Sequence, residues 1–274
     1  MTMKIGFIGA GNMASALVGG LLAKGLNPKS IALADMHLPQ LQRFADQGMF
    51  TTTRNEEVIE RADIVILSVK PQVMAEVLKP LATIIQQKKP LIISIAAGIN
   101  VDSLSRWLGG DLSIVRAMPN TPALVQTGAT GLYANPLVSF EQRQQTETVL
   151  GAVGLTLWVD DEALIDSVTA VSGSGPAYFF YVMEAMISAG KALGLDEKTA
   201  RALTLQTALG AAQMAITSDE PPAELRKRVT SKGGTTERAI ATFDEANMQQ
   251  IFAQALAACA ARGQELATIL GQQE

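Results

Sequence analysis

The chain of 274 residues, 48% apolar and 18% charged, is long enough for about two domains and has the composition of a globular protein rather than a disordered one. Its net charge of −4 argues against a nucleic-acid partner, its single cysteine (Cys259) excludes an internal disulfide, and no apolar run reaches the roughly 18 residues of a membrane span. We expect a cytoplasmic protein with no secretory signal, no membrane partner and no nucleic-acid partner.

Apolar runs alternate with amphipathic stretches up to about residue 158. The runs predicted as strands are nearly continuous in Val, Ile and Leu, as parallel strands covered on both faces are: residues 4–10, 31–34, 63–69, 90–97 and 112–118. Helical spacing of apolar residues predicts helices at 12–25, 39–48 and 71–86. This alternation predicts an α/β fold, with a Rossmann-like, doubly wound parallel sheet as a dinucleotide-binding domain over residues 1–158.

A glycine-rich turn, "IGFIGAGNMASAL", lies between the first strand and the first helix. In a dinucleotide site, Gly9 would permit the tight turn, Gly11 would let the backbone approach a pyrophosphate, and the small Ala14 would let the helix pack closely on the strand. An ordinary glycine turn is the alternative, which the position between strand and helix disfavours.

Asp35 follows the run at 31–34, where an acid would bond a ribose 2′-hydroxyl. A carboxylate there repels a 2′-phosphate and points towards NADH, whereas His37 and Arg43 nearby could meet that phosphate. His37 itself is expected to be an exposed loop residue rather than a catalyst. The sequence leaves the cofactor open between NADPH and NADH.

Further cofactor contacts are expected where later strands end, because ligands of open α/β sheets lie outside the carboxyl ends of the strands. "SVKPQ" (68–72) and "SIAAGI" (94–99) are such ends; Lys70 would line the crevice, and the small residues 96–98 would admit a nicotinamide or ribose. In "RAMPNTPAL", two prolines bracket Asn120 and Thr121, which predicts a rigid turn that presents Asn120 to the cofactor.

The second half reads as an all-α domain, residues 159–274. Helices rich in Ala, Leu and Met are predicted at 161–193, 196–217, 221–229 and 235–270, with a break at Ser172–Gly175 before Pro176. The helix after this break is apolar nearly all round, which is typical of a helix buried in a core or a subunit interface. We expect these helices to form an intertwined homodimer.

A second glycine turn, "TSKGGTTERAI" (230–240), also leads into a helix. Helix starts expose backbone N–H groups to anions, and a dinucleotide reductase needs a second anion site if its substrate is a small carboxylate. We therefore assign the substrate to Gly233, Gly234, Thr235 and Thr236, with Ser174 and Gly175 from the similar turn at 172–177. A capped helix start is the alternative for this segment.

These stretches together resemble the Δ1-pyrroline-5-carboxylate reductases, which make proline by reducing a cyclic imine. The matching segments run in order over residues 5–240: "IGFIGAGNMA", "SVKPQ", "SIAAG", "RAMPNTPA", "AVSGSGPAY" and "PAELRKRVTSKGGTTERAI". The resemblance implies a cofactor domain, a helical dimerisation domain and assembly of dimers into larger rings, such as a homodecamer.

The resemblance also implies the site. It places the cofactor on the turn Gly9, Ala10, Gly11, Asn12, Met13 up to Ala14, on Asn55, on Ser68, Val69, Lys70 and Pro71, and on Ile95, Ala96 and Ala97. It places the substrate carboxylate on the 233–236 loop and Glu162 close to the active site, where Thr236 and Glu162 are the catalytic candidates. Two positions depart from the family: many relatives have serine at Asp35, and proline is common at Lys232, where a positive charge could help gather a carboxylate.

The chemistry expected of this family matches the residues present. A protonated imine is already electrophilic, so its reduction needs chiefly a well-placed nicotinamide, and neither a catalytic histidine nor a metal is expected. Thr236 is assigned a hydrogen bond to the ring nitrogen. Two alternatives are a β-hydroxyacid or ketopantoate-type dehydrogenase, which would want a Lys or His proton donor, and a non-catalytic NAD(P)-sensing module, which would bind NAD(P)H without turnover. Lys191 could be such a donor but is read as structural, at the end of its helix.

Overall fold

The structure is a computed structural model that describes residues 3–272. It divides into two compact units. The first unit holds the chain up to Ser174 and again from Ala258, and the second holds Gly175–Ala257.

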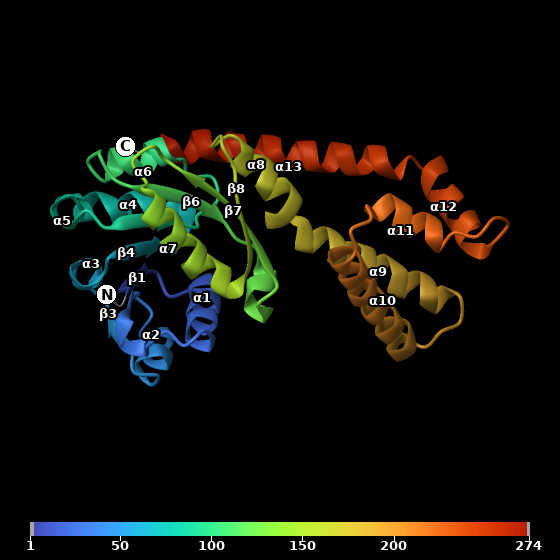
Figure 1. The fold of residues 1–274 in the computed structure, drawn as a ribbon, viewed down its shortest axis with the longest axis horizontal. Coiled ribbons are helices and arrows are strands. Elements are labelled where there is room, and N and C mark those ends of the chain that lie inside the picture. Colours follow the sequence, from blue (N-terminus) through green and yellow to red (C-terminus); the bar gives the residue numbers. More distant parts are fainter. Residues whose placement is uncertain (1–2, 273–274) are drawn as a thin grey trace. The chain divides into compact units, whose positions relative to one another are not determined.

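The first unit is built on a sheet whose strands lie in the order β3-β2-β1-β4-β5-β6-β7-β8 (Figure 1). The strands are β1 (Ile5–Ile8), β2 (Ile31–Ala34), β3 (Phe50–Thr52), β4 (Ile64–Leu67), β5 (Leu91–Ser94), β6 (Ile114–Met118), β7 (Gly128–Ala134) and β8 (Gly154–Trp158). Strands β1 to β6 are parallel, β7 is antiparallel to β6, and β8 is parallel to β7. In the central register, Ile5 of β1 lies beside Ile31 of β2 and Ile64 of β4.

The predicted α/β class is confirmed, with one difference in the sheet. The five predicted runs form β1, β2, β4, β5 and β6, whereas β3, β7 and β8 lack the dense Val, Ile and Leu signal of those runs. Because β7 and β8 run opposite to the first six strands, the sheet is mainly rather than wholly parallel.

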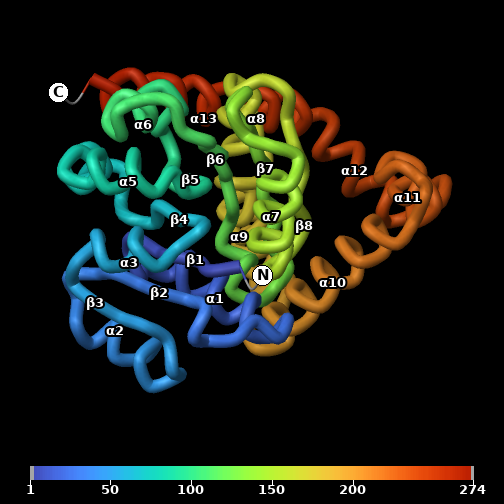
Figure 2. Tube along the Cα trace, turned by 60° about the vertical axis from the view of Figure 1, so that its left-hand side comes forward, coloured from blue at the N-terminus to red at the C-terminus, as the bar shows by residue number. Residues whose placement is uncertain are grey.

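Helices cover both faces of this sheet. Helices α1 (Asn12–Ala23), α2 (Leu38–Ala45) and α7 (Phe140–Leu150) pack on one face. The other face carries α3 (Asn55–Arg61), α4 (Met74–Leu78), α5 (Ala82–Lys88) and α6 (Val101–Trp107), together with the end of α13 (Met248–Gly271), which lies beside α6 in both views (Figure 2). The single helix predicted at 71–86 is divided into α4 and α5 by a 3-10 turn that contains Pro80.

The first unit extends beyond the boundary predicted after residue 158. Helix α8 (Leu164–Val168), a π-helical turn (Thr169–Gly173) and the last part of α13 belong to it. Contacts explain this difference: Arg116 of β6 pairs with Glu162 and Asp166, and Leu270 of α13 is buried in the core of the first unit.

The second unit consists of α9 (Gly175–Ala192), α10 (Glu197–Thr217), α11 (Pro222–Arg228), α12 (Thr235–Glu245) and the start of α13. The helix predicted over 235–270 is therefore two helices, because Asn247 adopts a left-handed conformation with φ 55° between α12 and α13. Large apolar side chains of this unit are exposed, such as Phe179, Phe180 and Tyr181 on α9. Among residues 3–272, no helix is long and apolar enough to cross a membrane.

Candidate functional site

The strand order reverses between β1 and β4, because the chain runs outward from β1 to β2 and β3 and then returns to β4 on the other side. In open α/β sheets this reversal opens a ligand crevice at the carboxyl ends of the two strands. The turn after β1 and the end of β4 are joined here, since Ser68 Oγ donates a hydrogen bond to the Gly9 carbonyl oxygen at 2.6 Å. Gly9 has φ 96°, and a Cβ at this position would lie 2.7 Å from the Ser68 carbonyl oxygen, so only glycine fits.

The N-terminus of α1 has room for an anion. Gly11 is its N-cap and makes no side-chain cap, and the first turn of the helix carries no acidic residue. No atom lies within 4 Å of the place where a Cβ of Gly11 would stand. Backbone N–H groups and the positive end of the helix dipole therefore face open space next to Asn12 and Met13, as a bound pyrophosphate requires.

Asp35, directly after β2, is hydrogen-bonded to the glycine turn between β1 and α1. Its Oδ2 accepts from Ala10 N at 2.7 Å and its Oδ1 accepts from His37 N at 2.8 Å, while Gln40 Nε2 donates to the Ala10 carbonyl oxygen. A carboxylate has about four acceptor positions, so the group can still accept from a ribose diol. His37 is exposed, as expected, and so is Arg43.

The loops after β4 and β5 lie side by side along the same edge of the sheet. Ile95 N donates to the Leu67 carbonyl oxygen at 3.2 Å, which joins the two strand ends. Ser68 and Val69 are half-buried, Ala96 is buried with Ala97 half-buried beside it, and Lys70 is exposed before Pro71. The structure therefore brings these predicted cofactor residues together with the turn at Gly9.

Of the last two predicted cofactor residues, Asn55 agrees with the others in its position and Asn120 differs. Asn55 begins α3 just after the carboxyl end of β3, on the same edge of the sheet as the others. The Asn120 side chain instead bonds within the protein: it donates to the Ser172 carbonyl oxygen at 3.0 Å and accepts from Ala129 N at 2.9 Å. A role of Asn120 in cofactor binding stays a prediction.

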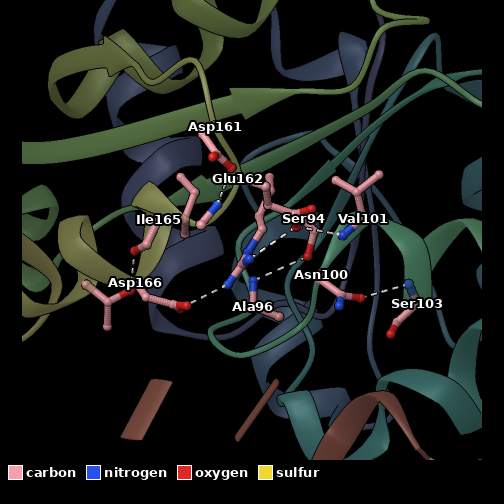
Figure 3. A network of polar contacts seen from close by, with 12 residues as sticks. Ser94, Ala96, Asn100, Val101, Ser103, Asp161, Glu162, Ile165 and Asp166 are labelled. Atoms are coloured by element: carbon pink, nitrogen blue, oxygen red, sulfur yellow. Dashed lines mark hydrogen bonds and ion pairs between the residues drawn. The ribbon is translucent and has the colours of Figure 1, made fainter. Parts of the chain in front are cut away.

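Glu162 lies in a network of polar contacts within the first unit (Figure 3). Its Oε1 accepts from Val101 N at 2.8 Å and from Arg116 Nη1 at 3.1 Å, and Arg116 Nη2 lies 3.7 Å from Asp166 Oδ1. Burial raises the pKa of Asp166 above its ordinary value, against the opposing effect of the Arg116 charge. Sequence reasoning missed Arg116 and Asp166; a charged residue inside the apolar run "LSIVRAM" was the available signal.

The predicted substrate loop belongs to the second unit. Gly234 is the N-cap of α12, Thr235 and Thr236 form its first turn, and no side chain caps the helix. Gly233 N donates to Glu237 Oε2 at 2.7 Å and Gly234 N donates to the Ser231 carbonyl oxygen at 3.0 Å, so the N–H groups of both glycines are occupied within the loop. The N–H groups of Thr235 and Thr236 lie in the first turn of α12, where a helix start suits an anion, and the assignment of this loop to the substrate stays a prediction.

Ser174 and Gly175, the other predicted substrate residues, lie at the junction of the π-helical turn and α9. Ser174 N donates to the Thr169 carbonyl oxygen at 2.8 Å, and its Oγ lies 3.3 Å from Cys259 Sγ. Their contact with a substrate is also still a prediction.

The fold and crevice define a class: an oxidoreductase that uses a nicotinamide dinucleotide. Two family models agree, one described as "NADP oxidoreductase coenzyme F420-dependent" that matches residues 4–98 and one described as "Pyrroline-5-carboxylate reductase dimerisation" that matches residues 162–266. The chain is 53% identical to a pyrroline-5-carboxylate reductase of Pseudomonas aeruginosa over 99% of both chains. It belongs to the pyrroline-5-carboxylate reductase family, as the sequence motifs predicted.

Solved structures give the same result. A pyrroline-5-carboxylate reductase from Coxiella burnetii is 44% identical with a TM-score of 0.94, and the match covers 97% of this chain and 99% of the other. A Plasmodium falciparum pyrroline carboxylate reductase with NADP bound is 27% identical with a TM-score of 0.85, over 97% and 98% of the two chains.

Proposed function

We propose that this chain reduces Δ1-pyrroline-5-carboxylate to L-proline with NADPH or NADH, the final step of proline biosynthesis. The observation that carries the proposal is a full-length relationship at 53% identity to a pyrroline-5-carboxylate reductase, in a chain that keeps the crevice between β1 and β4. The glycine turn, the uncapped start of α1 and the adjoining strand ends supply the parts that a dinucleotide needs.

Each part of the chain has a role in this reaction. The start of α1 at Gly11 binds the pyrophosphate, and the loops after β4 and β5 flank the nicotinamide half. Bound there, the cofactor supplies a hydride to the imine carbon. The 233–236 loop holds the substrate carboxylate through the N–H groups of Thr235 and Thr236 at the start of α12, and the Thr236 hydroxyl bonds the ring nitrogen and steadies its proton.

The two alternative functions are not favoured. The relatives are reductases of the imine rather than hydroxyacid dehydrogenases. Lys191, the lysine that a carbonyl reductase could use, pairs with Glu197 Oε2 at 2.8 Å, in agreement with a structural role.

We also propose that the second unit pairs with the same unit of another copy, and that the dimers assemble further into a homodecamer in the cytoplasm. The exposed Phe179, Phe180 and Tyr181 of α9 and the match to a dimerisation family support the pairing. Sedimentation analysis at micromolar concentrations tests it; a monomer would contradict the dimer, and a dimer that grows no further would contradict the decamer.

Steady-state oxidation of NADPH or NADH in the presence of Δ1-pyrroline-5-carboxylate, followed by absorbance, tests the activity. We expect turnover that depends on the imine, with proline as the product. Cofactor binding without turnover would favour the non-catalytic module instead.

A further inference from the structure

Arg116 is a charged residue in an unusual place. It lies within β6 and is 3% exposed, with its guanidinium between the carboxylates of Glu162 and Asp166. Its Nε is buried without a hydrogen-bond partner. Replacing a buried ion pair with apolar residues is often neutral or stabilising, so stability alone does not explain this group.

The polar network ends at the loop between β5 and α6, here called the 95–100 loop. Glu162 Oε1 accepts from the backbone N–H of Val101, the first residue of α6, at 2.8 Å. The N-cap residue Asn100 accepts from Ser103 N at 2.9 Å (Figure 3). Two N–H groups at the start of α6 are thus held by side chains, and one of these side chains comes from a segment 61 residues further along the chain.

The other end of the 95–100 loop is held by the sheet. Ile95 N donates to the Leu67 carbonyl oxygen at 3.2 Å, and Ser94, the residue before the loop, lies beside Arg116 in the strand register. A Cβ at Gly98 would lie 3.2 Å from Cβ of Leu266, so α13 packs against the middle of the loop. Glu162 therefore supplies the contact that fixes the exit of a loop already held at its entry and its middle.

Asp166 holds the far side of the guanidinium. Its Oδ1 lies 3.7 Å from Arg116 Nη2, and a Cβ added at Gly263 of α13 would lie 3.0 Å from the same oxygen. The carboxylate is therefore confined between β6 and α13. With carboxylates on both sides, the guanidinium has little freedom to turn away from Glu162.

We propose that Arg116, Glu162 and Asp166 act together as positioning residues for the nicotinamide half of the cofactor. Asp166 orients Arg116, Arg116 orients the carboxylate of Glu162, and Glu162 fixes the Val101 N–H group and with it the 95–100 loop. The proposal rests on the proposed function, because it places the nicotinamide at the carboxyl end of β5. Glu162 acts here through the loop and need not touch the reacting atoms.

Three variants test the proposal. Val101→Pro removes the N–H group and leaves every charge in place; proline is tolerated at the first position of a helix, and Asn100, at φ −85° and ψ 164°, already has the conformation that precedes proline. Glu162→Ala removes the acceptor, whereas Glu162→Gln keeps an acceptor oxygen. Each variant is titrated with NADPH and with 2′-phospho-ADP-ribose, which lacks the nicotinamide.

We expect Val101→Pro and Glu162→Ala to raise the Kd of NADPH about 10-fold, the loss of one hydrogen bond to a charged acceptor, with the Kd of the fragment unchanged. Glu162→Gln should restore most of the affinity for NADPH. The value of kcat should fall in the first two variants more than KM for the imine rises. Glu147→Gln is the matched control, since it changes a glutamate that bonds Trp158 Nε1, and it should alter neither Kd.

Several results would overturn the proposal. Equal weakening of NADPH and the fragment would show support of the whole domain rather than of the nicotinamide half. An unchanged Kd of NADPH in folded Val101→Pro would show that the loop does not depend on Glu162. If Glu162→Gln bound NADPH as weakly as Glu162→Ala does, the charge of Glu162 rather than its hydrogen bond would be decisive. Wild-type turnover of the imine is measured in parallel, so a failure of the proposed function is seen separately from these binding ratios.

Discussion

Substitution by alanine should affect stability at one glycine of the turn after β1 and cofactor binding at another. A methyl group at Gly9 would lie 2.7 Å from the Ser68 carbonyl oxygen and 2.9 Å from Val69 N, and the residue has φ 96°. A left-handed conformation costs a residue with a Cβ roughly 1–2 kcal/mol, and the backbone contacts must also lengthen towards the ~3.5 Å of normal packing. We expect Gly9→Ala to lower the free energy of unfolding by at least about 2 kcal/mol.

Gly11→Ala is the counterpart. Gly11 has φ −70°, which alanine adopts freely, and the methyl group meets no atom within 4 Å. Reduced freedom of the unfolded chain stabilises by about 0.4–1 kcal/mol, and alanine is a poorer N-cap than glycine, so the net change in stability should stay within about 0.5 kcal/mol. The methyl group nevertheless occupies the space in which the pyrophosphate would lie, so we expect the Kd of NADPH to rise about 10-fold or more.

Two measurements at one protein concentration decide the matter: unfolding in urea, and titration with NADPH followed by fluorescence. A fixed concentration matters because association of subunits makes apparent stability depend on it. Gly11→Ala with wild-type affinity would refute the placement of the pyrophosphate at the start of α1. Gly9→Ala with wild-type stability would refute the contact between the turn and β4.

Outcomes are also expected for four further variants. Asp35→Ser should shift the ratio of kcat/KM towards NADPH, because it removes a charge that repels a 2′-phosphate; an unchanged ratio would assign the choice to other residues. Thr236→Ala should lower kcat/KM about 10- to 150-fold, because it removes a hydrogen bond worth ~1.5–3 kcal/mol. Gly234→Val should raise KM for the imine and leave the Kd of the dinucleotide unchanged. If Gly234→Val instead weakened cofactor binding, the loop would bind the dinucleotide rather than the substrate. Because burial raises the pKa of Asp166, the folded chain holds the proton of this carboxyl more tightly than the unfolded chain does, and the stability that this proton contributes at acid pH is lost as the pH rises through the raised pKa. The free energy of unfolding, measured against pH, should therefore fall for the wild type relative to Asp166→Asn. Parallel curves for the two proteins would contradict this prediction.

The parts of the fold that could be predicted from the sequence are those whose pattern of residues lies within one short segment. Strands β1, β2, β4 and β5 are buried along their whole length, so both faces require apolar residues and the runs are nearly continuous. Strand β3 is half-buried, β8 alternates between half-buried and exposed residues, and β7 contains two glycines, so these strands carry weaker patterns. The division of the predicted helix 235–270 at Asn247 was missed, because the left-handed conformation of this residue depends on its surroundings and leaves no mark on the helical periodicity.

The features of the candidate site also divide into those with a local sequence signal and those without one. The turn at Gly9 and Gly11 was predictable because its spacing lies within one short segment between a strand and a helix. The contact of Arg116 with Glu162 joins positions 46 residues apart, and a single sequence carries no sign of such a pairing. The bond from Ala10 to Asp35 was missed for the same reason, although both residues were assigned to the cofactor.

The path of the chain limits how this protein can be dissected. The first unit ends at Ser174, and its core is completed only after Ala258, by Leu266 and Leu270 of α13. A fragment that stops at residue 158 or 174 therefore lacks one wall of its own core and exposes apolar side chains next to α6. An isolated cofactor domain needs a different design, in which a short linker joins residue 174 to residue 258 and the second unit is excised as an insertion.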